Sequence, residues 1–143
     1  MTQLINDTGF VVDDWTGGFR DWEAVTSSSY ATDAGYAVDV PNTVRAEQIK
    51  PYFNQVALIR IDFPSSHDGR GFTIARHLRL IGYTGRIRAH GRVLADQYAM
   101  ARRCGIDEVE ISDALAARQP EDQWLFRANW QDFNYQSRLR RSA

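Results

Sequence analysis

The 143-residue sequence contains a single cysteine, Cys104, and no long apolar run. One cysteine cannot form a disulfide within the chain, and such scarcity is typical of proteins from a reducing compartment. No apolar stretch approaches the roughly 18 residues of a membrane-spanning helix. Residues 1–7 also lack the basic and apolar regions of a secretory signal. We therefore expect a soluble, cytoplasmic protein.

Lysine is scarce as well, because Lys50 is the only lysine among 17 lysine and arginine residues. The excess of arginine fits a GC-rich genome, and it also fits bidentate recognition of anions. The formal net charge is -1, which provides no overall positive charge to attract nucleic acid or acidic membranes. We expect neither nucleic acid nor a membrane as a partner.

Common cofactor and catalytic motifs are missing from the sequence. It has no G-x-G-x-x-G, no phosphate-binding loop with its lysine and no nucleophile elbow. His67, His77 and His90 are not spaced as metal ligands, and one cysteine cannot hold an iron–sulfur cluster. The sequence therefore predicts no cofactor and no metal site.

The length fits one domain, residues 1–143, with two parts. Residues 1–35 are expected to form a β-hairpin, turning at Asn6-Asp7-Thr8-Gly9, and an irregular flap rich in turn residues. Residues 36–143 are expected to form a core of β-α-β units with a C-terminal helix. The predicted strands are 36–40, 56–63, 86–89 and 108–111. The predicted helices are 44–53, 72–80, 93–103 and a C-terminal helical region carrying Trp124, Leu125, Ala128 and Phe133.

Alternating strands and helices predict an α/β fold with a four-stranded parallel sheet. Apolar and charged residues alternate along these strands, so one face of the sheet is apolar and the other charged. The charged face is predicted to carry Asp39, Arg60, Asp62, Arg86, Arg88, Glu108 and Glu110. A charged second face suggests half of a (β/α) barrel with a charged inner side. Either the N-terminal aromatic segment or a second subunit would cover that face.

The loops that follow the predicted strands form the expected ligand rim. The richest loop is 67–71, where Arg70 at the start of a helix could hold sulfite, sulfate or phosphate. The same residues also fit a turn capped by Asp68 with a solvated Arg70. Asp96 and Gln97, within a predicted helix, fit either hydrogen bonding toward the rim or a polar surface.

Asp62, Arg88 and Glu110 occupy equivalent positions near the ends of three successive strands. This spacing predicts a ladder of carboxylate, guanidinium and carboxylate. The ladder could bind a ligand, or it could neutralise a partly buried face and fix strand register. The remaining charged residues of the later strands are expected to face solvent: Arg60, Arg86 and Glu108.

A series of motifs runs in order between Phe63 and Glu110. These are Phe63-Pro64, Asp68-Gly69-Arg70-Gly71-Phe72, Ala75-Arg76, Leu78-Arg79, Gly82-Tyr83, Gly85, Arg88-Ala89, Gly91, Val93-Leu94, Asp96-Gln97, Arg103-Cys104-Gly105 and Asp107. In these motifs the chain resembles a bacterial domain-of-unknown-function family, number 934. It departs from the family pattern at Thr73 and Ile106, where serine and phenylalanine are usual.

The resemblance implies a pathway rather than a reaction. The family is labelled an oxidoreductase of sulfite reduction, and its genes tend to lie beside those for sulfite reductase. This implies an accessory protein of assimilatory sulfate and sulfite reduction that binds the reductase or an anionic sulfur intermediate. The candidate residues for anion or partner binding are Arg70, Arg76, Arg88, Asp96, Gln97 and Glu110.

Two other functions remain open, so the sequence leaves it undecided whether the chain is an enzyme. One is a small enzyme acting on a phosphorylated or sulfur-containing metabolite, with Asp62 or Asp68 as acid or base. The other is a non-catalytic interaction module whose charged sheet face pairs with a second copy in a homodimer.

Overall fold

The computed structural model describes residues 1–27 and 33–131, which form an α/β fold around one seven-stranded sheet. The strand order is β2-β1-β7-β6-β5-β4-β3, and strands β3 to β7 all run parallel to their neighbours. The parallel strands are β3 (Phe19–Asp21), β4 (Tyr36–Val40), β5 (Val56–Phe63), β6 (Arg86–Gly91) and β7 (Glu108–Ser112). The hairpin strands are β1 (Thr2–Asn6) and β2 (Gly9–Val11), and β1 pairs antiparallel with β7.

The sheet is larger than the four strands predicted from the sequence. All four are present as β4 to β7, and the hairpin is confirmed with its turn between Asn6 and Gly9. The prediction missed β3, which has only three residues and lies in the stretch expected to be irregular. It also left the hairpin outside the sheet, because pairing between residues 2–5 and 109–112 has no local sequence signal.

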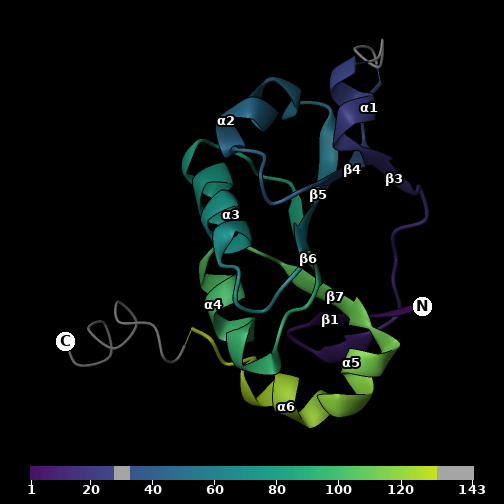
Figure 1. Cartoon of the computed structure of the whole chain (residues 1–143), viewed down its shortest axis with the longest axis vertical. Helices are drawn as coiled ribbons and strands as arrows, with labels where there is room; N and C mark the ends of the chain where they lie inside the picture. Colours follow the sequence, from purple (N-terminus) through teal and green to yellow (C-terminus); the bar gives the residue numbers. More distant parts are fainter. Residues whose placement is uncertain (28–32, 132–143) are drawn as a thin grey trace, which may run out of the picture.

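The helices that connect β4 to β5, β5 to β6 and β6 to β7 lie together on one face of the sheet (Figure 1). They are α2 (Ala46–Ile49) with the 3₁₀ helix η2 (Lys50–Tyr52), α3 (Arg70–Leu80), and the 3₁₀ helix η3 (Ala95–Gln97) with α4 (Tyr98–Arg103). The helix predicted over 44–53 is thus shorter, because Pro51 cannot donate a backbone hydrogen bond and the chain continues as η2. The helix predicted over 93–103 likewise begins as η3.

Three further helices complete the described chain. They are α1 (Trp22–Ser27), α5 (Asp113–Arg118) and α6 (Glu121–Phe126). The Ser112 side chain accepts a hydrogen bond from the backbone N–H of Leu115 and so caps the N-terminus of α5. Phe133, assigned to the C-terminal helical region, lies outside the described residues. No helix among the described residues is long and apolar enough to cross a membrane.

The predicted alternation of apolar and charged strand residues is confirmed. The apolar set is almost completely buried beneath the helices: Val38, Val40, Ile59, Ile61, Phe63, Ile87, Ala89, Val109 and Ile111. The charged set projects from the opposite face, where its members other than Asp62 form ion pairs. The sheet therefore separates a helix-covered hydrophobic core from a face built of ion pairs.

Arg79 connects the loops that precede β6 and β7. Its guanidinium donates hydrogen bonds to the backbone oxygens of Gly85 at 2.7 Å and Gly105 at 2.8 Å, and to Asp107 Oδ2 at 2.9 Å. Gly105 has a φ of +96°, and a Cβ there would lie 2.4 Å from Arg79 Cγ. Arg79 and its partners therefore fix the loops before β6 and β7 relative to α3.

Gly71 is required where α3 begins because a Cβ at this position would lie 2.4 Å from the Phe63 ring. We expect Gly71→Ala to lower the free energy of unfolding by about 2 kcal/mol, because the buried ring has no space to move. Gly69→Ala is the matched control, since no atom lies within 4 Å of its added Cβ. Urea denaturation of both variants checks this, and equal stability would contradict the assigned role of Gly71.

Candidate functional site

Arg88 lies at the centre of the charged sheet face with its side chain 0% exposed. Its Nε donates to Glu108 Oε2 at 2.6 Å, and its Nη1 donates to Glu110 Oε1 at 2.9 Å. Nη1 and Nη2 also bind the two carboxylate oxygens of Asp13, at 2.9 and 3.0 Å. Three carboxylates thus surround one buried guanidinium, an arrangement that compensates the cost of burying its charge.

Two more arginines extend these contacts across the sheet. Arg60 donates to Asp39 Oδ2 at 2.7 Å and to Glu110 Oε1 at 3.1 Å. Arg86 donates to Glu108 Oε1 at 2.6 Å. We call this set the sheet-face network; its members are Asp13, Asp14, Asp39, Arg60, Arg86, Arg88, Glu108 and Glu110.

The expectation that Arg60, Arg86 and Glu108 face solvent is wrong. The Glu108 side chain is 9% exposed and that of Arg60 is 16% exposed. Arg86 is 33% exposed and is paired with Glu108 and with Asp14. These residues follow the same alternation as Arg88 and Glu110, so they project from the same face and form ion pairs with them.

The N-terminal segment covers this face in the single chain. Asp13 pairs with Arg88, Asp14 pairs with Arg86 at 3.0 Å, and the Phe19 ring lies 3.6 Å from the Arg60 guanidinium carbon. Asp13 and Asp14 were not predicted as partners, although the arginines of the face required carboxylates from elsewhere. The sequence left either the N-terminal segment or a second subunit as the cover of the charged face, and the structure shows the N-terminal segment in contact with it.

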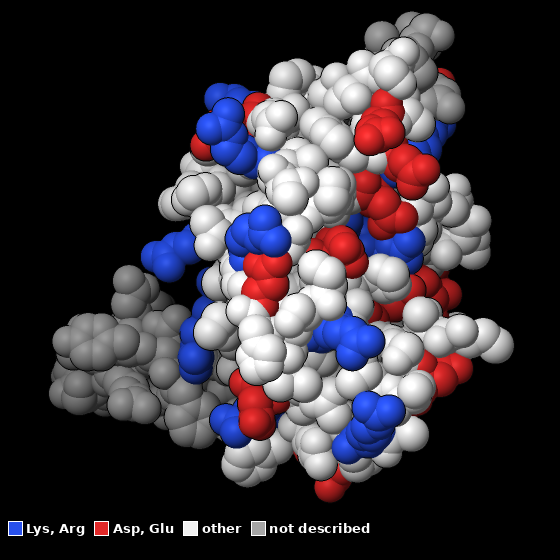
Figure 2. Space-filling view, viewed as in Figure 1, with Lys and Arg blue, Asp and Glu red and all other residues white. Residues whose placement is uncertain are grey.

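The predicted ladder is formed in part. Arg88 and Glu110 pair as expected, whereas Asp62 is exposed and lies opposite His90 on the neighbouring strand. Asp62 and His90 both line a cavity of about 560 Å³, together with Arg60, Asp39, Asp21 and Glu23. Acidic side chains gather on this part of the surface, over α1 and β3 (Figure 2).

Asp68 joins two loops at the carboxyl ends of β4 and β5. It accepts hydrogen bonds from Arg70 Nη2 at 2.7 Å and from the buried Asn42 amide at 2.8 Å. It also accepts one from the Arg70 backbone N–H at 3.1 Å. The Arg70 side chain remains 61% exposed. The predicted turn capped by Asp68 is present, and Arg70 belongs to it.

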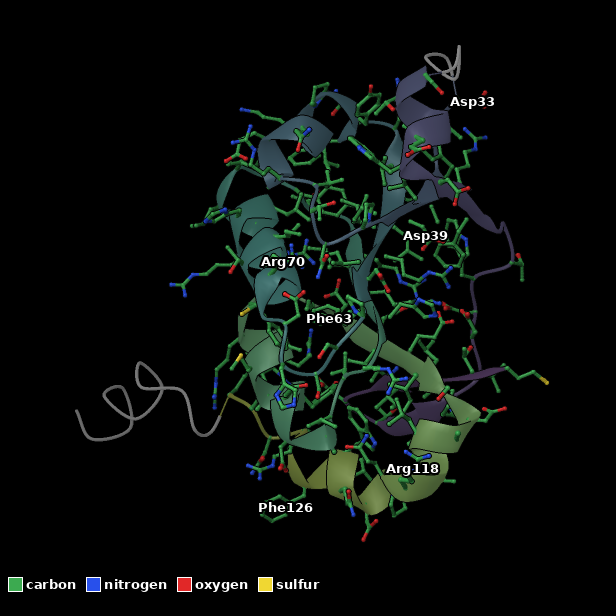
Figure 3. All side chains as sticks on the ribbon, in the orientation of Figure 1. Asp33, Asp39, Phe63, Arg70, Arg118 and Phe126 are labelled. Carbon is green, nitrogen blue, oxygen red and sulfur yellow. The ribbon has the colours of Figure 1, made fainter. Side chains whose placement is uncertain are left out.

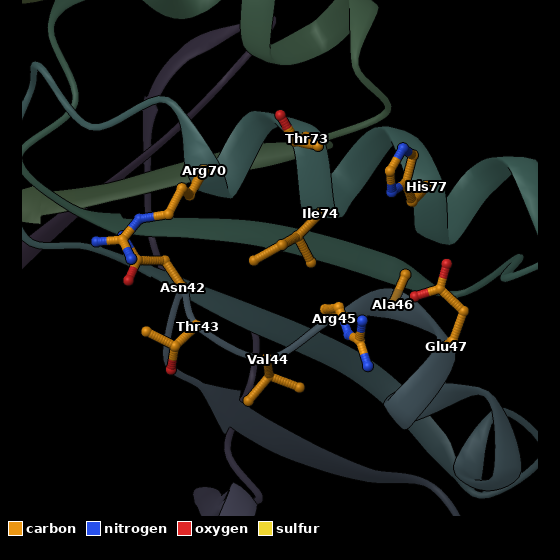
Figure 4. A pocket seen from close by; sticks show the side chains of 10 residues that line it. All are labelled: Asn42, Thr43, Val44, Arg45, Ala46, Glu47, Arg70, Thr73, Ile74 and His77. Carbon is orange, nitrogen blue, oxygen red and sulfur yellow. The ribbon is translucent and has the colours of Figure 1, made fainter.

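A groove of about 590 Å³ lies between α2 and α3 (Figure 4). Val44, Ala46 and Ile74 provide apolar side chains along it. Arg70 and Asn42 stand at one end, with Arg45, Glu47 and His77 toward the other. Such a combination of an apolar centre and a polar rim suits contact with another molecule.

The other predicted binding residues lie apart from this groove. Arg76 is exposed on α3 but does not line it. Gln97 donates to the Ser66 backbone oxygen at 2.8 Å and so anchors the loop before Asp68. Asp96 is 83% exposed and pairs with Arg127 at 3.2 Å. Of the predicted binding residues the structure therefore brings Arg88 and Glu110 together, whereas within the described residues no ion pair or side-chain hydrogen bond joins any two of the others: Arg70, Arg76, Asp96 and Gln97.

Ion pairing shifts the ionisation of these groups. Hydrogen bonds from Arg70 lower the pKa of Asp68 far below its usual value. The hydrogen bond from Arg88 lowers the pKa of Asp13. Burial alone would raise the pKa of Glu110, but Arg88 and Arg60 lower it overall. These carboxylates are therefore held ionised. No group of three or more His, Cys, Asp or Glu among the described residues is arranged to hold a metal ion.

Comparison of the sequence with known protein families finds a match to one family model. Residues 37–142 match the model of a family described as "Bacterial protein of unknown function (DUF934)". No curated protein and no solved structure matches the chain significantly.

We expect Arg88→Met to lower the free energy of unfolding by about 3–5 kcal/mol, because it leaves buried carboxylates without their central partner. Arg76→Met is the matched control, since Arg76 is exposed and should change stability by less than about 0.5 kcal/mol. Urea denaturation at neutral pH checks both variants. Similar small losses for the two would show that the sheet-face network contributes little to stability.

Proposed function

Since the chain belongs to the family of bacterial proteins of unknown function DUF934, we propose that it is an accessory protein of assimilatory sulfite reduction. It acts in the cytoplasm by binding sulfite reductase or an anionic sulfur intermediate. The pathway follows from the family resemblance between Phe63 and Glu110. The mode of action, binding rather than catalysis, follows from the side chains described above.

The observation that carries the proposal is the internal pairing of the charged face. Arg88, Arg60 and Arg86 are each bound by carboxylates of the same chain. A group that binds substrate needs hydrogen-bonding capacity directed toward it, and these side chains direct theirs mainly to one another. We therefore assign the sheet-face network a structural role.

The groove between α2 and α3 is the surface we assign to the reductase. Its centre is apolar at Val44 and Ile74, and its polar ends can form hydrogen bonds with a partner. Arg70 at one end offers a guanidinium that is well exposed despite its pairing with Asp68. The same guanidinium suits an anionic group on either the reductase or a sulfur intermediate.

Deletion of the gene should abolish growth on sulfate or sulfite as sole sulfur source, while sulfide or cysteine restores it. This pattern is expected because the proposed step lies between sulfite and sulfide. The measurement is growth yield on each source, with rescue by the wild-type gene. Equal growth of mutant and wild type on all four sources would remove the pathway assignment.

Thr73→Trp tests the groove directly, since Thr73 is an exposed residue that lines it. A tryptophan there should fill the groove and reduce recovery of sulfite reductase in pull-downs by about tenfold or more. Arg76→Trp, an exposed position on the same helix outside the groove, should recover as much reductase as wild type. Equal recovery with both variants would contradict the groove as the docking surface.

A second candidate function is favoured by the position of Asp62, which lies opposite His90 in the register of β5 and β6, at the rim where a half-barrel enzyme would hold its site. Both line one cavity with Arg60, so an acid or base and a cation lie near each other. If the chain is an enzyme on a phosphorylated or sulfur-containing metabolite, Asp62→Asn should abolish turnover while unfolding as wild type does. A metabolite screen without Asp62-dependent turnover would exclude this candidate.

A further inference from the structure

A separate cavity of about 290 Å³ lies at the carboxyl ends of β6 and β7. It is lined by Thr2 of β1, by the end of β6 and the arginine that follows it, and by the start and end of α5. It shares no lining residue with the groove between α2 and α3. Carboxyl ends of parallel strands are the usual place for ligands in open α/β sheets.

The ionisable side chains that line this cavity are all basic. Arg92, Arg118 and His90 line it, and no carboxylate does. The groove between α2 and α3 includes Glu47, and the cavity beside Asp62 is mostly acidic. This cavity therefore differs in charge from the other two.

Arg92 and Arg118 are exposed, and within residues 1–27 and 33–131 neither guanidinium is held by a carboxylate. This sets them apart from the arginines of the sheet-face network, each of which has a carboxylate partner. Two guanidiniums that line one cavity give it positive charge, and that charge would attract a bound anion.

We propose that this cavity binds a small oxyanion of the sulfate, sulfite or phosphate class through Arg92 and Arg118. Arginine presents paired N–H groups that match the oxygen spacing of such anions. His90 lies at the same cavity, with its Nε2 3.7 Å from Glu110 Oε2 and its side chain 36% exposed. Ser112 also lines the cavity, although its hydroxyl already accepts the α5 capping bond.

The cavity lies apart from the surface assigned to the reductase. Figure 3 shows Arg118 on α5, away from Arg70 at the start of α3. Loss of one site should therefore leave the other intact. The oxyanion site rests on the branch of the proposed function in which the chain binds an anionic intermediate, whereas binding of the reductase through the groove can fail independently of it.

Isothermal titration calorimetry of the full chain tests the site, with sodium sulfate, sulfite and phosphate titrated separately at constant ionic strength against a sodium chloride control. Arg92→Gln and Arg118→Gln should each weaken binding by about tenfold, and the double variant should abolish it. Arg103→Gln is the matched control, because Arg103 is exposed and does not line the cavity. It should bind as wild type does.

Preference among the three anions identifies the source of the ligand: tighter binding of sulfite or sulfate indicates a sulfur metabolite, and tighter binding of phosphate a phosphorylated one. The proposal would be overturned if the double variant bound the anions with unchanged affinity, or if Arg103→Gln reduced the affinity as much as the cavity variants do. It would also be overturned if the wild-type chain bound none of the three anions. Arg118→Gln should still recover sulfite reductase in pull-downs. This last measurement separates failure of the oxyanion site from failure of the proposed function.

Discussion

The buried guanidinium of Arg88 imposes a requirement on the rest of the chain. A positive charge in the middle of a sheet face is tolerated only with carboxylates in direct contact. Glu108 and Glu110 on β7 meet part of this requirement, and Asp13 meets the remainder from a segment far away in the sequence. The strand order, the register of β6 against β7 and the course of the N-terminal segment are therefore linked through one side chain.

The ion pairs around Arg88 also decide the role that we assign to the charged sheet face. A charged sheet face resembles an active site when the sequence is viewed alone, yet its arginines and carboxylates neutralise one another. Motif residues such as Arg79 and Gly105 also prove to hold loops in place. Exposed side chains line the cavities at the sheet rim and the groove between α2 and α3, and these are the surfaces to which we assign binding.

Local patterns predicted local structure well. The alternation in Val56–Phe63 located a strand and assigned its two faces, because side chains on a strand alternate strictly. What the sequence could not provide was pairing over long distances. Nothing near Asp13 indicates Arg88, and nothing in Thr2–Asn6 indicates β7 as its neighbour. The cavity at Arg92 and Arg118 was missed for the same reason, since its residues come from separate segments.

The antiparallel pairing of β1 with β7 has a consequence for synthesis of the protein. Residues 2–5 leave the ribosome before their partners at 109–112, which emerge more than a hundred residues later. Until those residues have been made, the edge of β1 that faces β7 is unpaired, and such edges attract other strands. The interval between the synthesis of β1 and that of β7 is therefore the period in which the nascent chain is most exposed to wrong strand pairing.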